Sequence, residues 1–180
     1  MTVLVCALIS LVLLFADLVI KGWAEAVNVY QADYFLGFIR WNFEENPGMA
    51  FGMLANNRTG MIVITALTVV MIIGLVVLFF TAFKHNKPAR VGLAIIEAGA
   101  IGNLVDRLIL GYVRDMVDVS PIGFGVCNFA DFYITGGAVF LIFVIMFIGK
   151  DAVLPLKKKW RDAAKAEAEE KERAKAAKKQ

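Results

Sequence analysis

The sequence has few of the side chains on which many enzymes depend for catalysis. It contains one histidine and two cysteines in 180 residues. The single histidine, His85, lies in a short basic loop that the topology described below places on the cytoplasmic side, so we expect neither a histidine-based catalytic triad nor a zinc site. The patterns HExxH, GxSxG, GxGxxG and the P-loop are also missing. If the protein is an enzyme, its carboxylates are therefore the main catalytic groups available.

Charge is scarce as well. Charged residues make up 19% of the chain and hydrophobic residues 59%, and the mean hydropathy is +0.69. Soluble domains are nearer to about 45–50% apolar, so this composition argues against a water-soluble fold. Most of the Lys and Arg residues lie from Lys150 onward, which leaves the apolar part of the chain close to neutral.

Four apolar runs are each long enough for a membrane-spanning helix, which needs about 20 residues. They predict an all-α polytopic membrane protein with four transmembrane helices, at residues 3–23, 61–83, 91–110 and 132–149. Basic residues gather at 84–90 and from Lys150 onward. The excess of positive charge on cytoplasmic loops then predicts that both termini are cytoplasmic.

Two connecting segments face outward in this topology. Residues 24–60 mix aromatic and charged side chains, and the near-alternation over Phe38–Glu44 predicts short strands. We expect this segment to form a small β-rich periplasmic cradle on the outer face, with a short interfacial helix over Met49–Ala55. Residues 111–128 are expected to be a loop. Residues 1–150 then form the membrane domain, and residues 151–180 a charged, Ala-rich helical tail.

Several polar residues from separate parts of the sequence meet near the outer surface in this topology. Asp115 and Asp131 are the candidate catalytic pair, because paired carboxylates can hydrolyse a peptide bond when one is ionised and the other protonated. Asp118 is the alternative candidate for the catalytic role that is assigned to Asp115. The alternative is that these aspartates are helix caps or solvated loop charges.

Two helix faces carry further polar residues. Asp17 and Lys21 are four residues apart, a spacing that predicts an ion pair, either as a structural pair or as support for a site. Asn103, Asp106 and Arg107 lie with Gly99 on one face of the third run. That group is either part of the site or a polar cluster in helix packing.

Four blocks, in order, resemble the lipoprotein signal peptidase family, the signal peptidase II aspartyl proteases of bacterial membranes. The first is Asp17–Lys21 (DxxxK), and the second is Asn46–Phe51, similar to NxGxAF. The third is Gly102–Arg107 (GNxxDR) followed by Gly111–Asp115 (GxVxD), and the last is Asn128–Asp131 (NxAD). The chain departs from the family pattern at Ile20, Arg114, Met116 and Phe132.

The resemblance implies a catalytic dyad of Asp115 and Asp131. It also implies substrate-binding residues at Asn46, Gly48, Asn103, Arg107 and Asn128, supported by Asp17 and Lys21. The expected reaction removes the signal peptide of diacylglyceryl-modified prolipoproteins just before the lipidated cysteine. It would take place at the periplasmic side of the bacterial inner membrane, among membrane lipids.

The resemblance implies no metal, no organic cofactor and no nucleic-acid partner, and globomycin-type cyclic peptides are the expected inhibitors. The alternative function is that of a small non-enzymatic membrane protein, such as a transporter subunit or an assembly factor.

Overall fold

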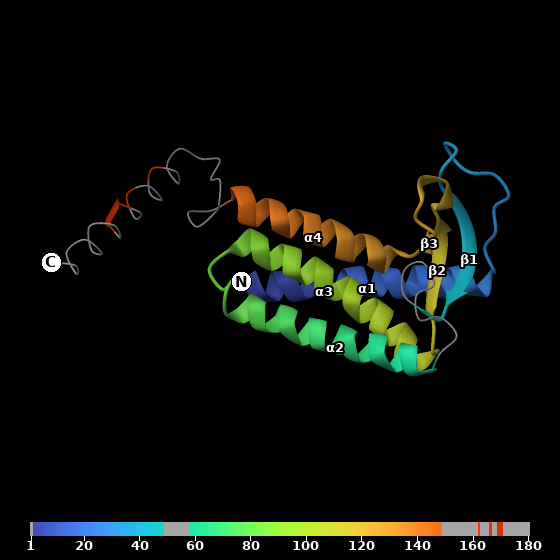
Figure 1. Cartoon of the computed structure of the whole chain (residues 1–180), viewed down its shortest axis with the longest axis horizontal. Helices are drawn as coiled ribbons and strands as arrows, with labels where there is room; N and C mark the ends of the chain where they lie inside the picture. Colours follow the sequence, from blue (N-terminus) through green and yellow to red (C-terminus); the bar gives the residue numbers. More distant parts are fainter. Residues whose placement is uncertain (1, 49–57, 149–161, 163–165, 167–168, 171–180) are drawn as a thin grey trace.

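Four long helices lie side by side, and a small sheet stands at one end of them (Figure 1). The computed structural model describes residues 2–48, 58–148, 162, 166, 169 and 170. The helices are α1 (Thr2–Ala26), α2 (Arg58–Phe80), α3 (Lys87–Ile109) and α4 (Phe129–Phe147). The strands are β1 (Arg40–Asn46), β2 (Val113–Asp118) and β3 (Val126–Cys127), and η2 (Ser120–Ile122) is a single 3-10 turn.

Three of these helices are long and apolar enough to cross a membrane: Val3–Ala26, Thr59–Phe80 and Phe129–Phe147. They confirm three of the predicted apolar runs as helices. The fourth run is also a helix, α3, but it is not among those apolar enough to be a candidate span by composition. It carries Lys87, Arg90, Glu97, Asp106 and Arg107, which lower its hydropathy.

Helix α3 is the centre of the bundle and packs against α1, α2 and α4 (Figure 1). Small residues make this close packing possible. A side chain at Gly99 would collide with the backbone oxygen of Ala130, and one at Gly137 would collide with Ile96. The backbones of α3 and α4 therefore approach closely, as small residues permit between membrane helices.

The sheet has the order β1-β2-β3, and both pairs are antiparallel. The predicted strand over Phe38–Glu44 is confirmed as β1, shifted toward the C-terminus. The prediction that residues 111–128 form a loop is wrong, because β2, η2 and β3 lie there. The extended conformation of β2 depends on its pairing with β1, in which Glu44 lies opposite Asp115. Pairing between residues so far apart in the chain cannot be predicted from the local sequence.

The sheet packs onto the end of the helical bundle through an apolar cluster. Ala24 of α1 meets Met116, Val117 and Val119, with Trp41 beside them. This cluster fixes β2, and hence Asp115, relative to the helices. The predicted interfacial helix over Met49–Ala55 and nearly all of the predicted helical tail lie outside the described residues.

Candidate active site

Asp115 and Asp131 are held by one residue, Asn128, which lies directly before α4. The Asn128 side chain donates from Nδ2 to Oδ1 of Asp115 at 2.6 Å. Its Oδ1 accepts from the backbone N–H of Asp131 at 3.1 Å, and its own backbone N–H donates to Oδ2 of Asp131 at 3.1 Å. The last two bonds form a capping box at the start of α4. A helix cap thus brings the two carboxylates to one place.

Two further asparagines complete the hydrogen bonding of the pair. Asn46, at the end of β1, donates from Nδ2 to Oδ2 of Asp115 at 2.9 Å. Asn103, on α3, donates from Nδ2 to Oδ1 of Asp131 at 2.8 Å. Each carboxylate therefore accepts two hydrogen bonds from neutral groups, and neither is in an ion pair within the described part of the chain.

The pair borders a cavity of about 540 Å³ between the sheet, α3 and α4. Both aspartates and five other predicted site residues line it: Asn46, Gly48, Asn103, Arg107 and Asn128. The remaining wall is apolar and includes Ile122, Phe124 and Phe132. Pockets that bind organic ligands commonly combine an apolar wall with a few directed polar groups, and this cavity has that character.

The electrostatics of Asp115 suit acid–base chemistry. Its side chain is only 2% exposed. Burial, together with the nearby Asp131 charge, raises the pKa of Asp115 to about 7, although the bonds from Asn46 and Asn128 oppose this shift. A carboxyl group with a pKa near neutrality can hold a proton near neutral pH and give it to a bound group.

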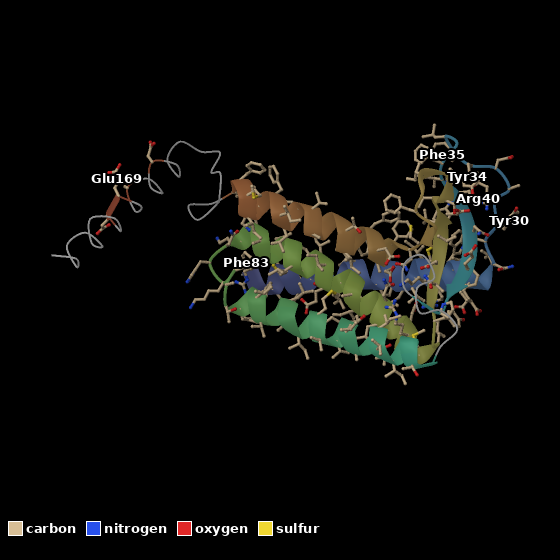
Figure 2. The ribbon with its side chains drawn as sticks, viewed as in Figure 1. Tyr30, Tyr34, Phe35, Arg40, Phe83 and Glu169 are labelled. Atoms are coloured by element: carbon tan, nitrogen blue, oxygen red, sulfur yellow. The ribbon has the colours of Figure 1, made fainter. Side chains whose placement is uncertain are left out.

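Asp118 has a different environment, although it lies on the same strand as Asp115. It accepts hydrogen bonds from Ser120, from Tyr34 at 3.0 Å and from Arg40 at 2.8 Å. Burial alone would raise the pKa of Asp118, but these donors outweigh it and lower the pKa to about 2. Asp118 does not line the cavity, and in Figure 2 its partners Tyr34 and Arg40 lie on the outer part of the sheet.

Asp17 and Lys21 lie beneath the cavity and not in its wall. Their predicted ion pair is present, with Nζ of Lys21 2.9 Å from Oδ2 of Asp17, and both side chains are fully buried. Lys21 also donates to Oδ1 of Asn103 at 2.8 Å. Asp17 accepts from the backbone N–H of Ala130 at 2.9 Å. This pair therefore orients Asn103 and the first turn of α4.

A glycine makes room for that pair, and this predicts a stability effect. A side chain at Gly102 would meet Oδ2 of Asp17. We expect Gly102→Ala to turn Asp17 away from Lys21 and to lower the free energy of unfolding by about 1–3 kcal/mol. The measurement is the thermal unfolding temperature in detergent. Gly136→Ala is the matched control, because nothing lies within 4 Å of its added carbon, and equal unfolding temperatures for the two variants would contradict the prediction.

One charged network was missed by sequence reasoning. Arg114 donates to Asp106 at 2.7 Å and to Glu25 at 3.0 Å, and Lys21 lies 3.5 Å from Asp106. The network ties β2 to α1 and α3 immediately beside Asp115. The sequence feature that could have revealed the network is Arg114, where the chain departs from the family pattern. An arginine between Val113 and Asp115 in a mostly apolar chain needs an acidic partner.

Cys127 borders the cavity but is not suited to nucleophilic chemistry. Burial raises the pKa of its thiol to about 12, with a further contribution from the charges of Asp131 and Asp115. The thiol therefore stays protonated, whereas the thiolate is the reactive form. Over the described ranges, no three His, Cys, Asp or Glu side chains are grouped as metal ligands would be.

The helices and the cavity at their end define a helical membrane protein with a carboxylate pair in the cavity wall. The sequence profile of the signal peptidase (SPase) II family matches residues 9–147. A lipoprotein signal peptidase of Latilactobacillus sakei is 33% identical over 141 residues, covering 77% of this chain and 91% of that protein. One of Clostridioides difficile is 34% identical over 142 residues, covering 78% and 93%.

A solved structure described as a bacterial membrane enzyme, determined by the in meso method at 2.3 Å resolution, superposes with a TM-score of 0.70. It is 26% identical, and the match covers 78% of this chain and 86% of that one. A second structure, described in the same way at 1.9 Å, gives a TM-score of 0.65 at 28% identity, covering 79% and 92%. The chain belongs to the signal peptidase II family and is a membrane-protein member of this family of peptidases. Membership favours the peptidase over the non-enzymatic alternative.

Proposed function

We propose that this chain is an aspartyl endopeptidase that removes the signal peptide from diacylglyceryl-modified prolipoproteins, just before the lipidated cysteine. Family membership supports the reaction. The observation that supports an aspartyl mechanism is that Asn128 bonds to both Asp115 and Asp131 and so holds them at the wall of one cavity. Paired carboxylates are the group of side chains in this cavity that can activate water without a metal.

In this mechanism Asp115 supplies the proton, since burial and the nearby Asp131 charge raise its pKa to about 7, and Asp131 is assigned the role of the base. Asp131 takes a proton from a water molecule, whose oxygen attacks the scissile carbonyl carbon. Asp115 donates its proton to the carbonyl oxygen. The tetrahedral intermediate then collapses: Asp115 takes back a proton from a hydroxyl group of the intermediate, the C–N bond breaks, and the amine of the cysteine leaves with the proton from Asp131. The pair together keeps one proton throughout the cycle.

The other cavity residues bind and orient the substrate. Arg107 is the main candidate, because its Nε is buried without a hydrogen-bond partner in the described part of the chain, and Nη2 lies 3.4 Å from the Gly48 oxygen. Asn46 and Asn103 hold the aspartates in place, and Gly48 lies in the cavity wall beside them, with its backbone N–H donating to Asn46. The apolar wall suits the residues that flank the cleavage site.

The protein spans the inner membrane four times in this proposal, with both termini cytoplasmic and the sheet at the periplasmic side. Helix α3 is the fourth span, although its composition is too polar to indicate this. The supporting reason is its central place, because twelve of its residues are buried by protein, and the polar residues Arg90, Asn103 and Asp106 are among them. Residues 1–150 form the catalytic domain, and residues 151–180 a separate charged tail.

The partners follow from this arrangement. The diacylglyceryl group of the prolipoprotein stays in the bilayer among membrane lipids while the scissile bond enters the cavity at the interface. Globomycin-type cyclic peptides are the expected inhibitors, since they would occupy the same cavity. Neither a cofactor nor a nucleic acid takes part in this reaction.

A cleavage assay tests the proposed function. The purified protein in detergent is incubated with a precursor carrying the diacylglyceryl group, and the products are identified by mass spectrometry. We expect a single cut directly before the modified cysteine. The matched control is the same precursor with that cysteine replaced by serine, which cannot be modified and should stay intact. Equal cleavage of both precursors, or a cut elsewhere, would refute the substrate assignment.

A further inference from the structure

A second cavity lies at the other end of the bundle from the aspartate pair. It is a groove of about 350 Å³ between α1, α2 and α3. Its wall is almost entirely apolar and includes Cys6, Ala7, Phe79 and Phe80. The end of the groove formed by Phe79 and Phe80 lies near the turn between α2 and α3, where Phe83 is labelled in Figure 2. The proposed catalytic chemistry uses none of these residues.

Arg90 is a buried cation beside that end of the groove, outside its wall but in contact with the lining residue Phe79. Its guanidinium stacks over the ring of Phe79, 4.0 Å from the ring centroid, and lies 6.0 Å from that of Phe80. The residue is 8% exposed, and its Nε has no hydrogen-bond partner among the described residues. The side-chain hydrogen bond that it makes there is long, 3.4 Å from Nη1 to the Lys84 oxygen.

No carboxylate of the described chain forms an ion pair with Arg90. Glu97 is on the same helix and lines the same groove. It lies seven residues further along, however, which is about 10 Å of helical rise. Burying a cation without a counter-ion is costly, and the stacking on Phe79 compensates only part of that cost. The surroundings of Arg90 therefore suit an anion from outside the protein.

The position of Arg90 in α3 strengthens this requirement. Arg90 and Lys87 both lie in the first turn of the helix, which has no acidic residue. The positive end of the helix dipole is there, so cations at this end are unfavourable and an anion is favourable. Lys84 adds a third positive charge in the preceding turn. Three cations at a helix N-terminus are unfavourable for the stability of the helix, whereas they favour the binding of an anion.

The chemistry of the groove selects the kind of anion. A phosphate alone would leave the apolar walls around Ala7 and Phe79 without an occupant. A phospholipid matches both parts, with its phosphate at the basic end and an acyl chain in the groove. Basic pockets between membrane helices on the cytoplasmic side are known to suit anionic headgroups.

We propose that the end of this groove at Arg90, Lys87 and Lys84 binds one anionic phospholipid of the inner leaflet, with an acyl chain between α1 and α2. The assignment to the inner leaflet rests on the orientation in the proposed function. Binding of the lipid neutralises Arg90 and fills the groove between three helices. The lipid is thereby a structural ligand of the bundle, remote from the catalytic cavity.

Native mass spectrometry of the purified protein in detergent tests this proposal, with phosphatidylglycerol and phosphatidylcholine added at equal concentration. We expect one phosphatidylglycerol to be retained and phosphatidylcholine to be retained about five- to tenfold less. Arg90→Gln should reduce the bound phosphatidylglycerol about tenfold. Lys87→Gln, at an exposed position that folding does not need, should reduce it severalfold. Arg58→Gln is the charge-matched control at the opposite end of α2 and should change nothing.

The groove itself is tested with a neutral substitution. Ala7→Phe adds bulk to the groove wall without changing charge, and it should also reduce the retained phosphatidylglycerol severalfold. Glycerol phosphate at the same concentration should not displace the lipid. Equal retention of both lipids, full retention by Lys87→Gln and Arg90→Gln, or displacement by glycerol phosphate would overturn the proposal. The measured quantity is the mass of the bound lipid, and the experiment needs no peptidase substrate. Its result is therefore independent of whether the peptidase assignment is correct.

Discussion

Replacing either Asp115 or Asp131 by asparagine is expected to lower the rate of prolipoprotein cleavage at least about a thousandfold. Asparagine has nearly the same shape as aspartate, but it can neither hold a transferable proton nor take one from water. Since the two carboxylates act as a unit, the double variant should be no slower than the single ones. The measurement is single-turnover cleavage of a lipidated precursor, with protein amount determined in the same samples.

Asp118→Asn is the matched control for this experiment. It lies on the same strand as Asp115, but it is bonded to Arg40, Tyr34 and Ser120 and lies outside the cavity wall. We expect it to retain cleavage within about tenfold and to lose some stability, because it leaves Arg40 without its charged partner. If Asp118→Asn were inactive and Asp115→Asn active, the catalytic role would belong to Asp118.

The activity is expected to fall as the pH rises through about 7. Above this value Asp115 loses the proton that polarises the scissile carbonyl, because its pKa is about 7. The pH profile of kcat/KM, measured from pH 5 to pH 9, should therefore show a descending limb with an apparent pKa near 7, which belongs to the pair as a whole. A profile that is flat up to pH 9 would contradict this assignment of the proton.

The same pKa has a consequence for stability. It is raised above the ordinary value of 3.8, so the folded protein binds this proton more tightly than the unfolded chain does. The linked stability is complete below about pH 4 and is lost as the pH rises through 7, with a difference on the order of 4 kcal/mol. Asp115→Asn should lack this slope, so its unfolding temperature relative to the parent should increase from pH 5 to pH 8.

Much of the helical fold could be predicted from composition alone. The runs that became α1, α2 and α4 are apolar enough that their backbone groups can be satisfied in a membrane as helices. The Asp17–Lys21 ion pair was predicted from the four-residue spacing, because that spacing depends on helix geometry and nothing else. Helix α3 was predicted as a helix, but its burial by three other helices could not be read from its sequence.

The site could be predicted only as a set of residues. The blocks around Asn46, Asn103 and Asn128 indicated which residues meet, and the described structure brings them to one cavity. The different roles of Asp115 and Asp118 could not be predicted, because the two residues look alike in sequence. Asp118 is bonded to the cation Arg40, to Tyr34 and to the nearby Ser120, whereas the side-chain donors to Asp115 are two neutral asparagines.

The sequence by itself determined the chemistry that is available: helices for a membrane, one histidine, and four recognisable blocks, three of which contain aspartates. These properties depend on composition and short spacings, which are local. Only the tertiary structure decided that the segment 111–128 contains the strands β2 and β3, that Arg114 pairs with Asp106 and Glu25, and that Asn128 joins the two carboxylates. Each depends on contacts between segments far apart in the chain, and the pKa of Asp115 arises from the burial and neighbouring charge that those contacts create.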